Sequence, residues 1–126
     1  MKLASSEWIA KAEGDFASAC RELRARNHPN YDAACFHSQQ CVEKLLKAVL
    51  AERDLPIRRT HDLEVLLDHC LTVAPLWEAI RPDCQLLTQY AVQFRYPGEF
   101  ADKDEARDAV KAMRRLREEA KKILSF

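Results

Sequence analysis

The chain has only two glycines and five prolines among its 126 residues. An all-β fold needs many tight turns, and these two residue types supply most of them, so the composition argues against such a fold. A glycine-rich loop of the kind that wraps phosphate groups cannot be built from two glycines either. The scarcity of turn residues therefore favours a helical chain and excludes the common phosphate-loop enzymes.

An excess of one charge and a long apolar run are also missing. Lys plus Arg number 20 and Asp plus Glu number 20, so the net charge is zero with His neutral. This balance argues against nucleic-acid binding driven by overall charge, although it leaves room for a local basic patch. No apolar run approaches the roughly 20 residues of a membrane span, and the first residues, MKLASSEW, do not resemble a signal peptide. We expect a cytoplasmic protein that makes no membrane contact.

Cysteine pairs at metal-binding spacing are absent as well. The five cysteines include no CxxC pair, and no Glu-x-x-His sequence is present for a di-metal carboxylate centre. We therefore expect no metal and no cofactor, and we interpret the cysteines as buried thiols in a reducing compartment. They are Cys20, Cys35, Cys41, Cys70 and Cys84.

Helical periodicity is what the chain does have, and it is clearest over residues 31–50, which contain neither Pro nor Gly. Small and apolar residues recur there at three- and four-residue steps, which places them on one face of a helix. His37, Gln40 and Lys44 form a polar line beside that face, and Glu43 and Lys47 are spaced for an ion pair. The apolar face consists of Ala34, Ser38, Cys41, Leu45 and Ala48.

Capping residues predict where the helices begin. Asn30 precedes the helix over residues 31–50, and Ser5 or Ser6 is the predicted cap of the first helix. Thr60 is the predicted cap of the third helix, and Asp102 that of the last.

The fourth helix is predicted to begin at Pro75 and to end near Arg95, with a kink or a break at Pro82. This makes five helices, four of them long, and the short connections make successive helices antiparallel neighbours. The sequence therefore predicts an all-α fold, an up-and-down four-helix bundle with one additional short helix, in a single domain spanning residues 1–126.

Two short segments carry the residue types that bind anions. Arg58, Arg59 and His61 lie beside the predicted start of the third helix, where a phosphate would meet positive charge and backbone N–H groups. The alternative is a capping turn whose Arg side chains are solvated or pair with acids. Arg95 and Tyr96 stand at the end of the fourth helix, where Arg95 could face a neighbouring molecule or bind the last carbonyls of its own helix.

Lys44 is a third candidate for binding a phosphate or an acidic partner, with His37 and Gln40 in support. The alternative is that these three side chains form hydrogen bonds within the bundle or at a dimer seam.

Three motifs in this order resemble those of the HEPN domain family: YDAACFHSQQCVEKLLKAVL at residues 31–50, RTHDLEVLL at 59–67 and YAVQFRYPGEF at 90–100. The resemblance extends from Ala12 to Leu124. It implies an all-helical bundle, in agreement with the periodicity. It also implies a homodimer, for which Tyr96, Pro97 and Phe100 would suit a partly apolar interface.

Ribonuclease members of the HEPN family carry an Arg, four to six variable residues and then a His. The resemblance aligns Arg95 with that Arg, but Phe100 stands where the His is expected, and no His follows it. Because Phe cannot transfer a proton, we expect RNA cleavage to be absent or very weak. Arg21 and His28 satisfy the bare spacing in a different helix, and we interpret that as chance.

The resemblance implies a non-enzymatic HEPN module that binds a nucleotide, RNA or a separate nucleotidyltransferase chain, in a toxin–antitoxin or regulatory pair. One alternative is a divergent ribonuclease toxin that uses Arg95 with a His from elsewhere, such as His61 or His37. The other is a purely structural dimerisation unit.

Overall fold

The computed structural model describes residues 1–92 and 96–126, and its regular secondary structure in those ranges consists of helices, with no strand. The all-α fold class predicted from periodicity is confirmed. The elements are α1 (Leu3–Arg24), α2 (Tyr31–Glu52), α3 (Leu63–Cys70), the 3-10 helix η1 (Pro75–Ile80), α4 (Arg81–Thr88) and α5 (Lys103–Lys121).

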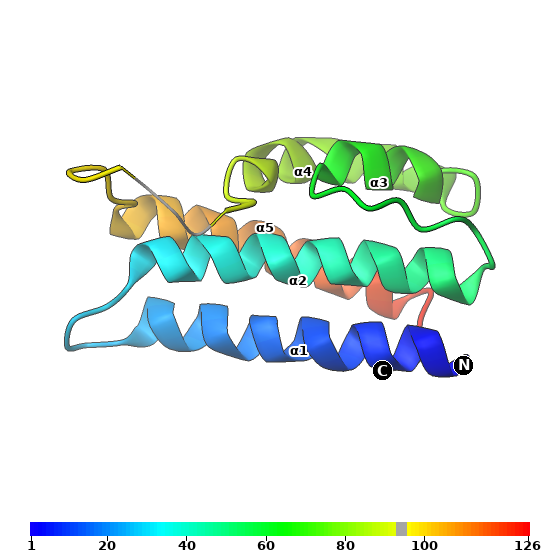
Figure 1. Ribbon diagram of the computed structural model, residues 1–126, viewed down its shortest axis with the longest axis horizontal. Coiled ribbons are helices and arrows are strands. Elements are labelled where there is room, and N and C mark those ends of the chain that lie inside the picture. The colour runs from blue at the N-terminus through cyan, green and yellow to red at the C-terminus, as the bar shows by residue number, and fades with distance from the viewer. Residues whose placement is uncertain (93–95) are drawn as a thin grey trace.

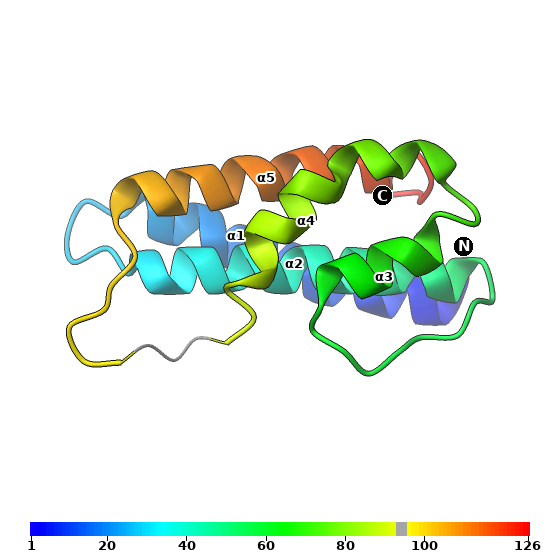
Figure 2. The same ribbon diagram turned by 90° about the horizontal axis from the view of Figure 1, so that it is seen from above.

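Helix α2 is the centre of the bundle (Figures 1 and 2). It packs against α1 on one side, against α5 on another, and under the shorter α3 and α4. Its apolar residues are buried around most of its circumference, and the predicted face from Ala34 to Ala48 lies fully in the core. Burial on several faces explains why polar residues of α2 must find partners inside the bundle. No helix in the described part of the chain is long and apolar enough to cross a bilayer.

Two of the predicted helix starts are confirmed. The Asn30 side chain accepts a hydrogen bond from the Ala33 N–H at 2.9 Å, and the Asp102 carboxylate accepts one from the Glu105 N–H at 2.8 Å. The predicted cap of α1 is wrong, because α1 already begins at Leu3. Ser5 is buried inside that helix, and the Ser6 hydroxyl donates to the Lys2 carbonyl at 3.2 Å.

Helix α3 is capped by Asp62 instead of Thr60. The Asp62 carboxylate accepts from the Glu64 N–H at 3.0 Å, and the Thr60 hydroxyl accepts from the Asp62 N–H at 3.1 Å. A charged carboxylate suits the positive end of a helix better than a hydroxyl, and here it displaces the cap by two residues. The Leu63 N–H donates to the Thr88 hydroxyl at 3.1 Å, so the start of α3 is tied to the end of α4.

The predicted long fourth helix is two short ones. Pro82 lies in the first turn of α4, where its missing N–H is not needed. Helix α4 ends at Thr88, well before Arg95, and Tyr90 turns inward so that its hydroxyl reaches the Glu105 carboxylate at 3.1 Å. Within the described ranges the bundle thus has three long helices, with α3, η1 and α4 covering them.

Replacing Leu45 with Ala should lower the free energy of unfolding by about 2–5 kcal/mol, because Leu45 is 2% exposed and truncation leaves a cavity in the centre of α2. Urea unfolding followed by circular dichroism measures this loss. Leu76→Ala removes the same atoms from a side chain that is 88% exposed, and it should change the stability by less than about 0.5 kcal/mol. An equally small effect of Leu45→Ala would contradict its place in the core.

Candidate functional site

A buried carboxylate on α2, that of Glu43, is the centre of a polar network. Its side chain is 5% exposed and has three hydrogen-bond partners. His61 Nδ1 lies 2.8 Å from Oε1, Gln39 Nε2 donates to Oε1 at 3.1 Å, and Lys47 Nζ donates to Oε2 at 3.1 Å. Two of these partners come from α2 itself, one turn before and one turn after Glu43, and the third comes from the segment that leads into α3.

His61 is held from two directions, yet its ring faces the solvent. The Gln39 amide donates to the His61 carbonyl at 3.1 Å, and Gln40 in turn donates to the Gln39 side-chain oxygen at 2.7 Å. The His61 side chain is 67% exposed although its Nδ1 is bonded to Glu43. The network therefore fixes both the backbone and the ring of His61 and leaves Nε2 for an outside partner.

The environment of Glu43 keeps its carboxylate charged. Burial alone raises the pKa of Glu43, but the hydrogen bonds from His61, Gln39 and Lys47 lower it by more, so the pKa lies below its ordinary value. A charged carboxylate accepts only, so the His61 ring donates through Nδ1–H. An imidazole oriented in this way by a carboxylate is the arrangement used in metal sites and in proton transfer.

A second buried carboxylate, Asp15 of α1, binds the other polar residues predicted on α2. His37 Nδ1 lies 2.8 Å from Asp15 Oδ1, and Lys44 Nζ lies 2.5 Å from Oδ2. The predicted polar line is thus divided, because His37 and Lys44 turn toward α1 while Gln40 joins the Glu43 network through Gln39. The charge of Lys44 is used to join α1 to α2.

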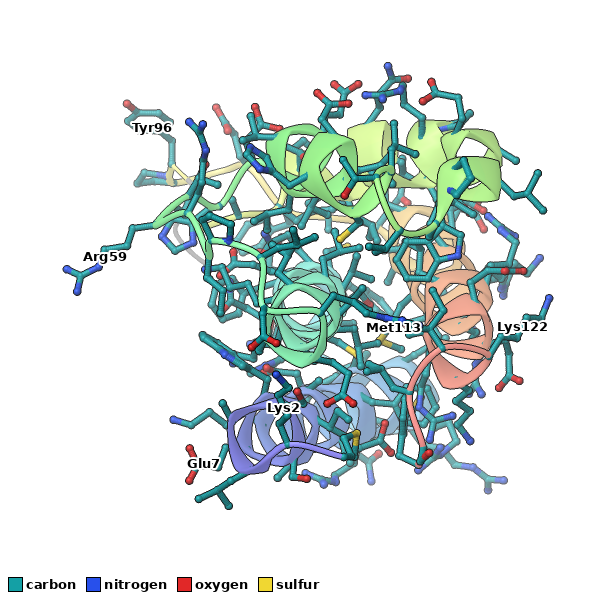
Figure 3. The ribbon with its side chains drawn as sticks, turned by 90° about the vertical axis from the view of Figure 1, so that its right-hand side faces the viewer. Lys2, Glu7, Arg59, Tyr96, Met113 and Lys122 are labelled. Atoms are coloured by element: carbon teal, nitrogen blue, oxygen red, sulfur yellow. The ribbon has the colours of Figure 1, made fainter. Side chains whose placement is uncertain are left out.

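The other predicted residues lie on one exposed side of the bundle. Arg58 and Arg59 are exposed in the segment before α3, and Tyr96 is 67% exposed in the segment before α5. Figure 3 shows Arg59 and Tyr96 pointing away from the same side of the bundle, and in Figure 2 both segments project from that side. Arg95, aligned above with the Arg of the ribonuclease motif, lies outside the described residues.

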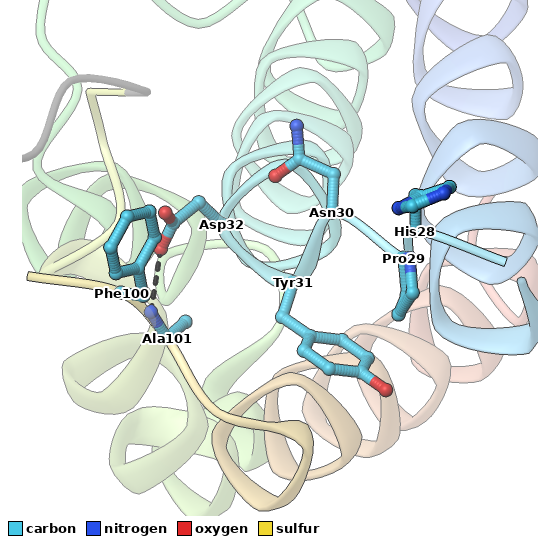
Figure 4. Close-up of a pocket in the computed structure, with 7 residues that line it drawn as sticks. All are labelled: His28, Pro29, Asn30, Tyr31, Asp32, Phe100 and Ala101. Carbon is cyan, nitrogen blue, oxygen red and sulfur yellow. Dashed lines mark hydrogen bonds between the residues drawn. The ribbon is translucent and has the colours of Figure 1, made fainter.

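Phe100, at the position where the resemblance leads one to expect the motif's His, is 76% exposed at a hollow of about 480 Å³ (Figure 4). The Asp32 carboxylate accepts from the Ala101 N–H at 2.7 Å and closes one side of it. His28 lines the far end of the hollow from Phe100, with Tyr31 between them. Phe100 thus gives this end of the bundle an exposed aromatic surface.

Other site chemistry is limited in the described ranges. No three His, Cys, Asp or Glu side chains there lie close enough together to hold a metal ion. Burial raises the pKa of the Cys70 and Cys84 thiols to about 12, so both remain protonated at neutral pH and are poor nucleophiles.

The fold and the sequence match known proteins. The family model of the HEPN domain matches residues 5–123, and the chain therefore belongs to the HEPN domain family. The crystal structure of ST0689, described as an archaeal HEPN homologue, superposes with a TM-score of 0.71 at 26% identity, covering 96% of this chain and 97% of that one. TT1696 from Thermus thermophilus has the same fold, with a TM-score of 0.75, 22% identity, and coverage of 98% and 100%. No curated protein matches the sequence.

The sequence motif indicates His61 as a site residue, but it does not indicate that Glu43 and Gln39 bind it. The only signal was the spacing of Gln39, Glu43 and Lys47, which recur every four residues and therefore share one side of α2. The sequence contains no signal for the role of Asp15, because its partners His37 and Lys44 lie 22 and 29 positions away along the chain.

Glu43→Gln should lower the free energy of unfolding at pH 7 by about 1.5–3 kcal/mol, because it removes the charge that binds Lys47 and His61. The folded-state pKa of Glu43 lies below its ordinary value of 4.5, so the stabilisation is fully present above that value and is lost as the pH falls through the lowered pKa. The difference between the two proteins should therefore shrink in acid, which urea unfolding at several pH values measures.

The control for this experiment is Glu118→Gln, which removes a charge from a side chain that is 67% exposed. It should change the stability by no more than about 0.5 kcal/mol. A difference between wild type and Glu43→Gln that stays constant down to acidic pH would show that the Glu43 charge is not what stabilises the fold.

Proposed function

We propose that this chain is a non-enzymatic HEPN module that binds the phosphate of a nucleotide or an RNA through Arg58, Arg59 and His61, a surface called here the Arg59 face. The observation that carries the proposal is the buried Glu43, which fixes the exposed imidazole of His61, two and three positions along the chain from two exposed arginines. Arg binds phosphate oxygens through two parallel hydrogen bonds, and the fixed His61 ring, in its protonated form, adds a donor through Nε2–H. Arg95 belongs to the same proposal through its match to the family motif.

Binding is favoured over cleavage because the motif's proton-transfer residue is replaced. Phe100 offers no group that titrates, and proton transfer typically contributes about 10²–10⁴-fold to such reactions. A ribonuclease is the second candidate, and one observation favours it. His61 is paired with a carboxylate through Nδ1 and exposes its other nitrogen, which is how a general base is held.

The partner chains are part of the proposal. We infer a homodimer that uses the exposed apolar residues of the segment before α5, of which Tyr96 and Phe100 are 67% and 76% exposed. We also infer a separate nucleotidyltransferase chain as the protein that this module regulates or is regulated by. Domain membership supports both inferences, because the chain belongs to the HEPN family over residues 5–123.

Arg59→Ala should weaken the binding of a fluorescent RNA, measured by anisotropy as salt is raised. Loss of one phosphate contact should make the slope of log affinity against log salt shallower by about 0.7–0.9. Arg107→Ala is the matched control, since it removes the same charge from α5, where Arg107 pairs with Asp104 at 3.3 Å. Equal effects of the two substitutions would contradict a site on the Arg59 face.

RNA cleavage by the same preparation should be absent or very weak over hours, because Phe100 cannot transfer a proton. Arg95→Ala should weaken RNA binding and leave the cleavage unchanged. Robust cleavage by the unmodified protein would overturn the non-enzymatic proposal, and its loss in His61→Ala would then support the ribonuclease.

Light scattering should give the mass of a dimer at micromolar concentrations. Phe100→Asp should shift the protein toward the monomer, because it places a charge in a proposed apolar contact while Phe100 makes little contribution to the core. A monomer at high micromolar concentration, with or without the substitution, would contradict the dimer.

A further inference from the structure

A second hollow lies on α1, apart from the predicted site residues. It measures about 310 Å³ and is lined by Ala4, Glu7, Trp8 and Lys11. The Trp8 indole is half-buried, so it packs on the core with part of its surface and forms a wall of the hollow with the rest. Trp77, the other tryptophan, is 5% exposed and belongs wholly to the core. Trp8 is thus the tryptophan that an outside molecule can touch.

Trp8 is connected to His61 through two side chains. The Lys47 ammonium lies over the Trp8 ring, 5.6 Å from its centroid, and donates to Glu43 at 3.1 Å. Glu43 in turn holds His61. Figure 3 shows Glu7, which lines the hollow, and Arg59 pointing out of the same side of the bundle. The hollow on α1 and Arg59, in the segment after α2, are therefore on the same side of the bundle.

The chemistry of this surface matches a single strand of nucleic acid. Every nucleobase can stack on an aromatic ring, whereas a duplex keeps its bases hidden and is bound mainly through its phosphates. A chain with zero net charge has little attraction for a duplex, but a few local cations suffice for one strand. Glu7 would repel a phosphate and can accept hydrogen bonds from base N–H groups, so the hollow suits a base, while Lys11 at its edge suits the adjoining phosphate.

We propose that the hollow beside Trp8 receives an unpaired base of a single-stranded RNA whose phosphates bind Arg58, Arg59 and His61. This inference rests on the proposed function, and it adds Trp8 and Lys11 to the site and single-stranded RNA as the ligand class. Lys47 and Glu43 act as positioning residues, because they fix the indole and the imidazole relative to each other.

The test is anisotropy with a short RNA that forms no base pairs, oligoadenylate, and a set of Trp8 variants. Trp8→Ala should weaken binding by about 5- to 150-fold, the usual loss for one stacked base. Trp8→Phe should retain most of the affinity because it can still stack, and Trp8→Leu should not, although it keeps an apolar side chain on the core. The salt slope should stay unchanged in all three, whereas Arg59→Ala reduces it. Circular dichroism checks that each variant is folded.

Phe126→Ala is the matched control, because Phe126 is another exposed aromatic ring beside cations, Arg117 and Lys121, and lies at the C-terminal end of the chain. It should leave RNA binding unchanged. The Trp77→Phe variant allows contact of RNA with Trp8 to be measured directly by fluorescence, because Trp8 is then the only tryptophan. Oligoadenylate should quench its fluorescence, and the quenching should follow the same curve as the anisotropy.

The outcomes separate this inference from the proposed function. If Trp8→Ala binds as well as Phe126→Ala while Arg59→Ala binds weakly, the stacking inference is overturned and the Arg59 face stands. If a duplex RNA binds as tightly as oligoadenylate with the same dependence on Trp8, the single-strand assignment is wrong. If the unmodified protein binds no RNA, the inference fails together with the RNA part of the proposed function.

Discussion

The buried charge of Glu43 is the constraint on which the covering half of the bundle depends. A carboxylate on the most buried helix would cost several kcal/mol without partners, and only Gln39 and Lys47 can reach it from α2 itself. The third partner, His61, comes from the chain that follows α2, and this contact holds that segment against the helix. Its position fixes the start of α3, and the bond from the Leu63 N–H to Thr88 then fixes the end of α4. One charge thus links α2 to both short helices.

Local signals predicted the fold well where local interactions decide it. The extent of α2 and the caps at Asn30 and Asp102 depend on residues within a turn of one another, and these predictions are confirmed. The predicted end of the fourth helix is wrong, because a contact between residues far apart in the sequence determines where this helix ends. Its apolar period continues past Thr88, but Tyr90 leaves the helix to reach Glu105 of α5, fifteen positions along the chain. Sequence spacing carries no information about that contact.

The difference between local contacts and contacts far apart in the sequence also explains which parts of the site could be predicted. His61 stands in a motif and was identified, whereas its partnership with Glu43 joins residues 18 positions apart and was not. Lys44 and Lys47 have the same chemistry and nearly the same place on α2, yet one binds Asp15 of α1 and the other binds Glu43. The i,i+4 spacing predicts the pair of Lys47 with Glu43, whereas the packing of α1 gives Lys44 its partner Asp15. A polar stripe therefore predicts that partners exist, and tertiary structure decides which they are.

The two buried carboxylates of the bundle differ in where they direct their histidines. Asp15 and Glu43 each hold an imidazole through Nδ1 at 2.8 Å. The His37 side chain is 27% exposed and, with Lys44, joins α1 to α2, so the Asp15 centre is a link between helices. The His61 side chain is 67% exposed and leads from the core to the solvent. Well-packed apolar residues often stabilise a core as well as a buried ion pair does, so stability alone is a weak reason for Glu43. Its distinctive effect is to hold one imidazole in a set orientation on the surface, in the same exposed segment as Arg58 and Arg59.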